Sequence, residues 1–161
     1  VRYTCATVGA RAVTADIRTF SAESAFNRAR FDIVTLWYVI EHMEQLDAVM
    51  RQLGTLVHPG GVLAFSTPSA EGISARKSRR SFLQRSPADH YTVWSPSTVD
   101  KALRRYGFSV RRVVSTGHHP ERFPGLLKSK AVRPLTAGLS KILRLGDTFE
   151  VYAVKEGKQR V

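Results

Sequence analysis

Two pairs of neighbouring residues in this chain have side chains that could move a proton or line a reaction pocket: Glu41-His42 and His90-Tyr91. A histidine ionises near neutral pH, so a well-placed imidazole can take the proton of a reacting hydroxyl. Two interpretations of the first pair stay open. Either His42 is a general base, or Glu41 caps a helix that begins near Glu44 and His42 only fills the turn before it.

The residues around the first pair predict a strand, a helix and a second strand. Residues 31–37 (FDIVTLW) form a nearly continuous apolar run, which is typical of a strand buried on both faces of a parallel sheet. Apolar residues then recur at helical spacing between 44 and 57, and the HPGG string at 58–61 ends that helix. A second apolar strand follows over 62–65. Parallel strands joined by a helix need a right-handed crossover, so the sequence predicts an α/β fold.

The rest of the chain predicts shorter elements around this unit. They are a helix end over 1–8, a strand over 11–15, a helix over 21–26 with Ser21 or Ser24 as its N-cap, a helix from Ser95-Pro96 through Tyr106, a strand over 108–114, one or two basic amphipathic helices over 125–145 broken near Pro134, and a strand over 148–154.

The composition limits the class of protein. A length of 161 residues is typical of one domain, and the single cysteine, Cys5, excludes an intramolecular disulfide and a cysteine-based metal site. No apolar run approaches the ~18 residues of a spanning helix and no signal peptide is visible, so we expect a cytoplasmic location. Residues 1–57 carry six basic and six acidic side chains, which places the whole net charge of +12 in residues 58–161.

Two interpretations of the basic stretches over 70–86 and 101–144 stay open. They could form a solvated face, or they could attract an anionic membrane surface and make the protein peripheral to it. The second interpretation depends on apolar residues that interleave with Arg and Lys: Phe82, Leu83, Leu126, Leu127, Leu135, Leu139, Ile142, Leu143 and Leu145. Nucleic acid is a less favoured partner, because no element that reads bases accompanies the charge.

Four strings in the central unit are similar to one protein family: FDIVTLW at 31–37, VIEH at 39–42, LVHPGG at 56–61 and STP at 66–68. Together with HY at 90–91 and YGF at 106–108, they resemble class I S-adenosylmethionine-dependent methyltransferases, in the branch that includes ubiquinone-pathway O-methyltransferases. The resemblance implies a Rossmann-like sheet that binds S-adenosylmethionine at the carboxyl ends of its parallel strands. It also implies methyl transfer to a small or lipid-like acceptor, a reaction that needs no metal.

The same resemblance assigns site residues by position. Asp16 matches the acid that contacts adenine, with Ile17 against the ring face, although Asp16 could instead only turn its loop. Trp37 and Tyr38 match the positions that contact the methionine part, where an aromatic face could favour a sulfonium. The branch often carries an acid at the position of Tyr38, and Trp37 could instead belong to the core. His42 would be the catalytic base, and His90 and Tyr91 would line the acceptor pocket.

The Gly-rich nucleotide-binding turn of that family has no counterpart here, because Gly9 is the only glycine before Gly54 and the chain starts at Val1 rather than methionine. We therefore expect a single partial methyltransferase domain over 1–161, truncated before its first two strands, with basic insertions over 70–90 and 117–147. Such a chain alone would bind the cofactor poorly, so whether it is an active enzyme stays open. The alternative class is a non-catalytic basic module; a nicotinamide enzyme is less favoured, because its dinucleotide fingerprint is absent.

Overall fold

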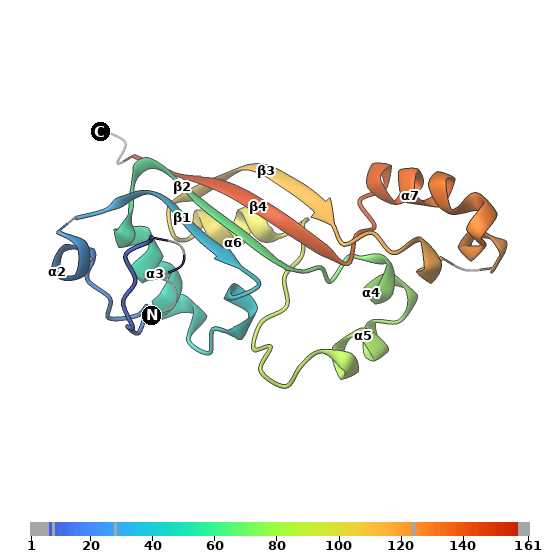
Figure 1. The fold of residues 1–161 in the computed structure, drawn as a ribbon, viewed down its shortest axis with the longest axis horizontal. Coiled ribbons are helices and arrows are strands. Elements are labelled where there is room, and N and C mark those ends of the chain that lie inside the picture. Colours follow the sequence, from blue (N-terminus) through green and yellow to red (C-terminus); the bar gives the residue numbers. More distant parts are fainter. Residues whose placement is uncertain (1–6, 8, 28, 124, 158–161) are drawn as a thin grey trace.

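The described residues of the protein form one open, four-stranded sheet with helices packed on one face (Figure 1). This computed structural model describes residues 7, 9–27, 29–123 and 125–157. The strands lie in the order β1-β2-β4-β3, with β1 parallel to β2 and β4 antiparallel to both of its neighbours. Their bounds are Phe31–Trp37 for β1, Val57–Pro68 for β2, Phe108–Thr116 for β3 and Thr148–Lys155 for β4. The predicted α/β class is confirmed.

The predicted strand-helix-strand unit is present as β1, the helix α3 (Leu46–Leu56) and β2. The second strand is longer than predicted, because the residues after α3 already pair with β1. Gly61 allows this pairing: a Cβ there would lie 2.8 Å from the Asp32 carbonyl oxygen. The buried side chains of α3 pack into the main core and are Val49, Met50, Leu53 and Leu56.

The face of β1 that looks away from α3 is open, so the prediction of a strand buried on both faces is wrong. Val34 and Leu36 pack against the core, whereas Ile33 is 64% exposed and Trp37 is 46% exposed. The physical reason is that helices pack on only one face of the sheet. The helices α3 and α6 (Val99–Arg104) contribute to the core on the first face, and within the described ranges no helix covers the second.

One further prediction of secondary structure is wrong, and one predicted helix is present but shorter. Residues 11–15 form no strand; a strand needs a neighbour to complete its backbone hydrogen bonds, and no described strand pairs with this segment. The helix expected from Ser95 through Tyr106 is only α6, because the Ser95 carbonyl accepts the Thr98 and Val99 N–H groups in a turn that precedes the helix. Gly107, with φ +76°, follows the turn after its end.

The other predicted elements are confirmed with shifted bounds. Ser21 caps α2 (Ala22–Phe26) by accepting the Ser24 N–H at 3.2 Å. The basic segment after β3 folds into short 3-10 turns and α7 (Arg133–Ile142), whose first turn contains Pro134. The turns are η2 (Pro120–Arg122), η3 (Gly125–Lys128) and η4 (Lys130–Val132). The helix end expected over 1–8 lies, apart from residue 7, outside the described residues, as does Cys5.

The basic segments extend the molecule beyond one end of the sheet. Figure 1 shows α4 (Ile73–Lys77) and α5 (Arg79–Arg85) after the carboxyl end of β2, with α7 farther along the long axis. Asp147 joins α4 to the turn before β4: its carboxylate accepts the Ser74 N–H at 2.8 Å and the Ser74 hydroxyl at 2.7 Å. No helix among the described residues has the length and apolarity needed to cross a membrane.

Candidate functional site

The carboxyl ends of β1 and β2 hold the backbone turn that carries the first chemical pair. After β1 the chain turns at Tyr38, whose φ of +54° is rare for a non-glycine residue and often marks a functional turn. The Tyr38 N–H lies 3.1 Å from both the carbonyl oxygen and the hydroxyl of Ser66 on β2. The 3-10 turn η1 (Ile40–His42) follows, and its buried Ile40 and Glu41 side chains fix the position of His42.

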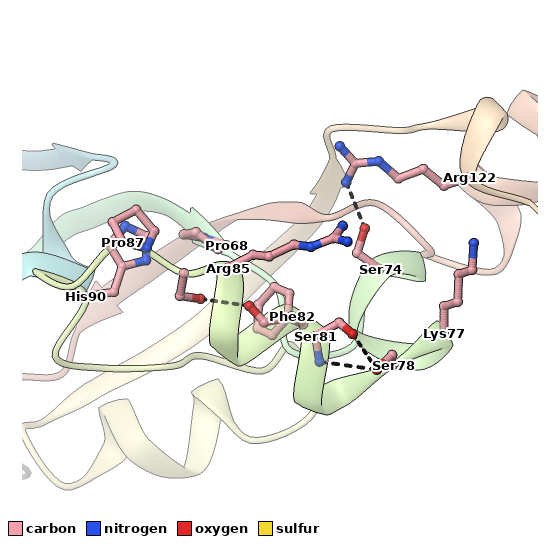
Figure 2. A pocket seen from close by; sticks show the side chains of 11 residues that line it. Pro68, Ser74, Lys77, Ser78, Ser81, Phe82, Arg85, Pro87, His90 and Arg122 are labelled. Atoms are coloured by element: carbon pink, nitrogen blue, oxygen red, sulfur yellow. Dashed lines mark hydrogen bonds between the residues drawn. The ribbon is translucent and has the colours of Figure 1, made fainter.

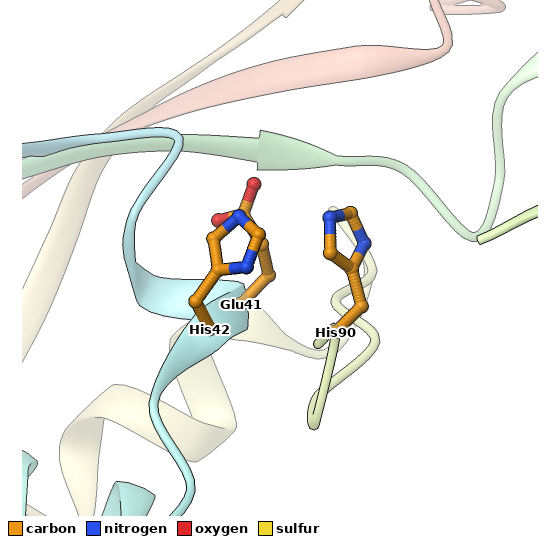
Figure 3. A group of neighbouring side chains, drawn as sticks. All are labelled: Glu41, His42 and His90. Atoms are coloured by element: carbon orange, nitrogen blue, oxygen red, sulfur yellow. The ribbon is translucent and has the colours of Figure 1, made fainter. Parts of the chain in front are cut away.

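The loop that carries the second pair lies against this turn. The Glu41 carbonyl accepts the N–H groups of Tyr91 at 2.9 Å and Thr92 at 3.3 Å, and these bonds bring His90 beside His42. The imidazole rings of His42 and His90 meet edge to face with centroids 4.6 Å apart (Figure 3). The structure therefore joins residues of the two sequence-predicted pairs in one cluster.

The surroundings of His42 suit a proton acceptor. Its Nδ1 lies 3.0 Å from the Asp89 carboxylate and 3.2 Å from the Asp89 carbonyl oxygen. Both partners are acceptors, so Nδ1 carries the hydrogen and the neutral ring keeps a lone pair on Nε2. The carboxylate would also stabilise an imidazolium. Asp89 was not among the predicted site residues, because nothing in the sequence spacing indicates that its loop reaches His42.

Glu41 is buried beside the two histidines, with 1% of its surface exposed. Its Oε2 has no hydrogen-bond partner within the described part of the chain, so the interpretation of Glu41 as a helix cap is wrong. One potential ligand atom from each of Glu41, His42 and His90 lies within 4.8 Å of the others. One carboxylate and two imidazoles are donors that a divalent cation accepts, so these residues could hold one.

Asp16 and Ile17 share a small cavity of about 190 Å³ with His42, as expected for residues of one site. Asp16 is engaged by Arg18, whose Nη2 lies 2.5 Å from Asp16 Oδ2. This hydrogen-bonded guanidinium lowers the pKa of Asp16 to about 2, so the carboxylate is ionised at neutral pH. Sequence analysis missed this pairing, although the spacing of the two residues permits it.

Trp37 and Tyr38 lie at the carboxyl end of β1 with 46% and 52% of their surfaces exposed. The interpretation of Trp37 as a core residue is therefore wrong, and both rings are free to contact a ligand. Tyr91 is also exposed, and the nearby Glu44 carboxylate raises its pKa above the ordinary value. The exposed surfaces of these three aromatic residues are compatible with binding roles.

A larger cavity of about 520 Å³ has His90 among its lining residues (Figure 2). It lies among the end of β2, α4, α5 and the loop that carries His90. Phe82 supplies an apolar wall, and Lys77, Arg85 and Arg122 supply positive charge. His90 thus contacts both the cluster and a cavity large enough for a small organic molecule, since ligand pockets usually measure about 300–1,000 Å³.

Sequence comparisons point to one family. A family model described as a methyltransferase domain matches residues 3–113. A ubiquinone biosynthesis O-methyltransferase of Stutzerimonas stutzeri is 29% identical over 113 residues, which are 65% of this chain and 49% of the relative. The enzyme of the same description from Paraburkholderia phytofirmans is 40% identical over 57 residues, which are 34% of this chain and 25% of the relative. The chain thus spans at most about half the length of these curated relatives.

Solved structures share the fold at low sequence identity. The complex of the Haloferax volcanii Trm112 methyltransferase activator with a putative methyltransferase gives a TM-score of 0.58 at 15% identity, covering 92% of this chain and 62% of the matched chain. Magnesium protoporphyrin IX methyltransferase from Synechocystis, solved with bound SAH, gives a TM-score of 0.52 at 16% identity. The match covers 89% of this chain and 50% of the matched chain. These similarities establish the arrangement of strands and helices, and they carry no information on the acceptor.

Proposed function

Because the chain belongs to the methyltransferase domain family, whose model matches residues 3–113, we propose that it serves methyl transfer from S-adenosylmethionine to a hydroxyl of a small, lipid-like acceptor. The observation that carries this proposal is the contact of His42 with His90. One ring lines the small cavity beside Asp16 and Ile17, and the other lines the large cavity. Ligands in the two cavities would meet at this pair. The ubiquinone-pathway descriptions of the relatives support a lipid-like acceptor.

The residues of the small cavity fit the cofactor in part. Asp16 could accept a hydrogen bond from the adenine amino group, and Ile17 could pack on the ring. Trp37 and Tyr38, which do not line this cavity, could contact the methionine end from the carboxyl end of β1. The cavity of about 190 Å³ is smaller than the roughly 300–1,000 Å³ of pockets that enclose a drug-sized ligand. We therefore propose that this chain alone holds the cofactor weakly.

The chemistry assigned to the chain is alignment and proton acceptance. When bound, S-adenosylmethionine supplies an electrophilic methyl group. His90 and Tyr91 would hold the acceptor hydroxyl near His42, since alignment of the two reactants is the main contribution that an enzyme makes to such a displacement. As the hydroxyl oxygen forms its new bond, Nε2 of His42 would take the proton and Asp89 would stabilise the imidazolium.

Tryptophan fluorescence tests the cofactor half of this proposal. The chain has two tryptophans: Trp37 is half exposed at the site, and Trp94 is buried. Titration with S-adenosylhomocysteine should change the emission with a Kd of about 1 mM, which corresponds to a binding free energy of roughly −4 kcal/mol. The change should disappear in Trp37→Phe. An unchanged emission at saturating concentrations, or a response that survives in Trp37→Phe, would count against the assigned site.

A second candidate function, binding to an anionic membrane surface, is favoured by one feature of α7. Leu135 and Ile142 are 70% and 79% exposed, and the helix carries Arg133 and Lys141. Apolar side chains among bases are typical of helices that lie in the membrane interface. Flotation with phosphatidylglycerol vesicles should recover the protein at low salt, and Leu135→Ser combined with Ile142→Ser should abolish recovery. Equal recovery with phosphatidylcholine vesicles would refute an electrostatic attachment.

A further inference from the structure

An open cavity of about 560 Å³ lies along β3, the strand at the free edge of the sheet. Its walls are the second half of β3, the turn that follows this strand, and the end of α7, which Figure 1 shows beyond the end of β3. We propose that this cavity binds a phosphate group through Arg112, Lys141 and Arg144. The proposal does not depend on the proposed function, because this cavity shares no lining residue with the two cavities described above.

The three basic side chains of the cavity have no acidic partner. None of them forms an ion pair within the described ranges, and no Asp or Glu lines the cavity. Glu150 lies on the neighbouring strand β4, where its carboxylate accepts the Tyr152 hydroxyl at 2.6 Å. Glu121 pairs with His119 at 2.9 Å. Three uncompensated cations around one cavity raise its positive potential and attract an anion.

The edge of β3 adds backbone donors to these charges. The Thr116 carbonyl oxygen lies against Gly146, on the side of β4, whereas the Ser115 carbonyl oxygen lies 3.1 Å from Nε2 of His118. Neighbouring residues of a strand direct their N–H and C=O groups to opposite edges, so Ser115 and Val113 direct theirs to the free edge. An edge strand leaves such N–H groups unpaired, and both residues line the cavity. Two N–H groups are therefore available to an anion.

The backbone at the end of α7 places Arg144 at the cavity. Arg144 has a φ of +52°, in the left-handed region that glycine usually occupies at a helix end. This helix end is complete without charged side chains, because the N–H groups of Arg144 and Leu145 donate to the carbonyls of Lys141 and Ser140. Strained backbone of this kind is typical of functional sites, and an arginine here supports a ligand-binding role.

His118 fixes α7 against β3, so the walls of the cavity are held in place without a ligand. Its Nε2 faces the Ser115 carbonyl, which can only accept, so Nε2 carries the hydrogen and Nδ1 accepts the Ser140 hydroxyl at 2.7 Å. A preformed cavity lowers the cost of ordering on binding. His118 also occupies the edge of β3 at Ser115, which leaves room for a compact ligand rather than for an extended peptide strand.

The number of donors indicates a phosphate. A carboxylate offers two oxygens and a single charge, whereas a phosphate monoester offers three acceptor oxygens and a charge of about −2, which suits three cations and two N–H groups. The cavity is larger than a phosphate ion, so the group would belong to a larger molecule. Ile142 and Leu143, between two of the cations in the sequence, are 79% and 51% exposed. The phosphate could therefore come from a soluble ester or from a lipid headgroup.

NMR of the ¹⁵N-labelled chain tests this proposal. Titration with glycerol 3-phosphate at constant ionic strength should shift the N–H signals of Val113 and Ser115, and uncharged glycerol should not. Arg112→Gln and Arg144→Gln should each weaken binding about tenfold, because a charge-assisted hydrogen bond contributes roughly that factor. Arg111→Gln is the matched control, since this exposed neighbour on β3 does not line the cavity.

The outcomes separate the proposal from its alternatives. Absence of the two N–H shifts, or equal weakening by Arg111→Gln, would overturn it. Dihexanoyl phosphatidic acid below its micelle concentration distinguishes the two sources of phosphate. Tighter binding than glycerol 3-phosphate, with the gain lost in Ile142→Ser, would support a lipid headgroup, and equal affinity would support a soluble ester. The response of Trp37 to S-adenosylhomocysteine reports on the proposed function alone and should be the same in Arg144→Gln.

Discussion

The imidazole rings of His42 and His90 meet edge to face, with 4.6 Å between the ring centroids, although the two residues belong to different elements. His42 ends the turn η1, and His90 belongs to the loop after α5. The contact depends on backbone hydrogen bonds, because the Glu41 carbonyl accepts the N–H groups of both Tyr91 and Thr92. The proposed base and the proposed acceptor pocket are therefore held together by the main chain.

The first prediction concerns the base. Replacement of His42 with glutamine, which keeps a polar side chain and cannot accept the proton, should lower the rate of methyl transfer by about 10²–10⁴-fold, the usual contribution of a general base. The rate is measured as transfer of labelled methyl from S-adenosylmethionine at saturating acceptor. His58→Gln is the control, because His58 is exposed near the start of β2, away from His42, and its Nδ1 hydrogen-bonds the Pro59 carbonyl oxygen. Equal losses in the two variants would show that the effect is not specific to His42.

The second prediction concerns pH and the pair of Asp16 with Arg18. The hydrogen-bonded guanidinium lowers the pKa of Asp16 from 3.8 to about 2. A carboxyl with a lowered folded-state pKa binds fewer protons folded than unfolded, so its stabilising effect is complete above pH 3.8 and is lost as the pH falls to about 2. Arg18→Gln should raise the pKa of Asp16 toward 3.8 without reaching it, because the backbone N–H of residue 18 still donates to the carboxylate. Carboxyl ¹³C NMR measures this shift, and a pKa still near 2 in the variant would contradict it.

The central unit could be predicted from the sequence because its signals are local. The apolar run of 31–37, the helical spacing from Leu46 to Leu56 and the glycine at 61 each dictate the conformation of their own segment. Whether a helix packs on a given face of a strand depends on distant segments of the chain and not on the strand's own residues. Ile33 and Val34 have similar side chains, but neighbouring residues of a strand point to opposite faces of the sheet. Only Val34 is on the face that packs against the core with α3 and α6.

The sequence could predict which residues belong to the candidate site, but not how those residues are arranged. The residue types at Asp16, His42 and His90 indicated chemistry, and the structure brings Asp16 and His42 to one cavity and His90 to the next. The contact between His42 and Asp89 and the burial of Glu41 result from long-range packing of the loop at 89–92. No periodicity in the sequence encodes that packing.

The third prediction concerns the cost of burying Glu41. Its side chain is 1% exposed, and its Oε2 lacks a partner among the described residues. A buried carboxyl oxygen without a hydrogen-bond partner destabilises a folded protein, so Glu41→Gln should raise the free energy of unfolding by about 1 kcal/mol. Urea denaturation measures the change. Glu44→Gln, at an exposed position next to the cluster, should have little effect; a clear loss of stability in Glu41→Gln would mean that the carboxylate has a stabilising partner.

The last prediction concerns two glycines with opposite surroundings. A Cβ at Gly146 would collide with the Thr116 carbonyl oxygen and come within 2.6 Å of the Ser115 hydroxyl, and the carbonyl cannot move without disturbing β3. Gly146→Ala should therefore destabilise the protein by about 1–3 kcal/mol, the usual cost of overpacking. Gly138 lies within α7, where a Cβ would meet open space, so Gly138→Ala should stabilise the helix by roughly 0.5–1 kcal/mol. Urea denaturation of both variants measures the two signs.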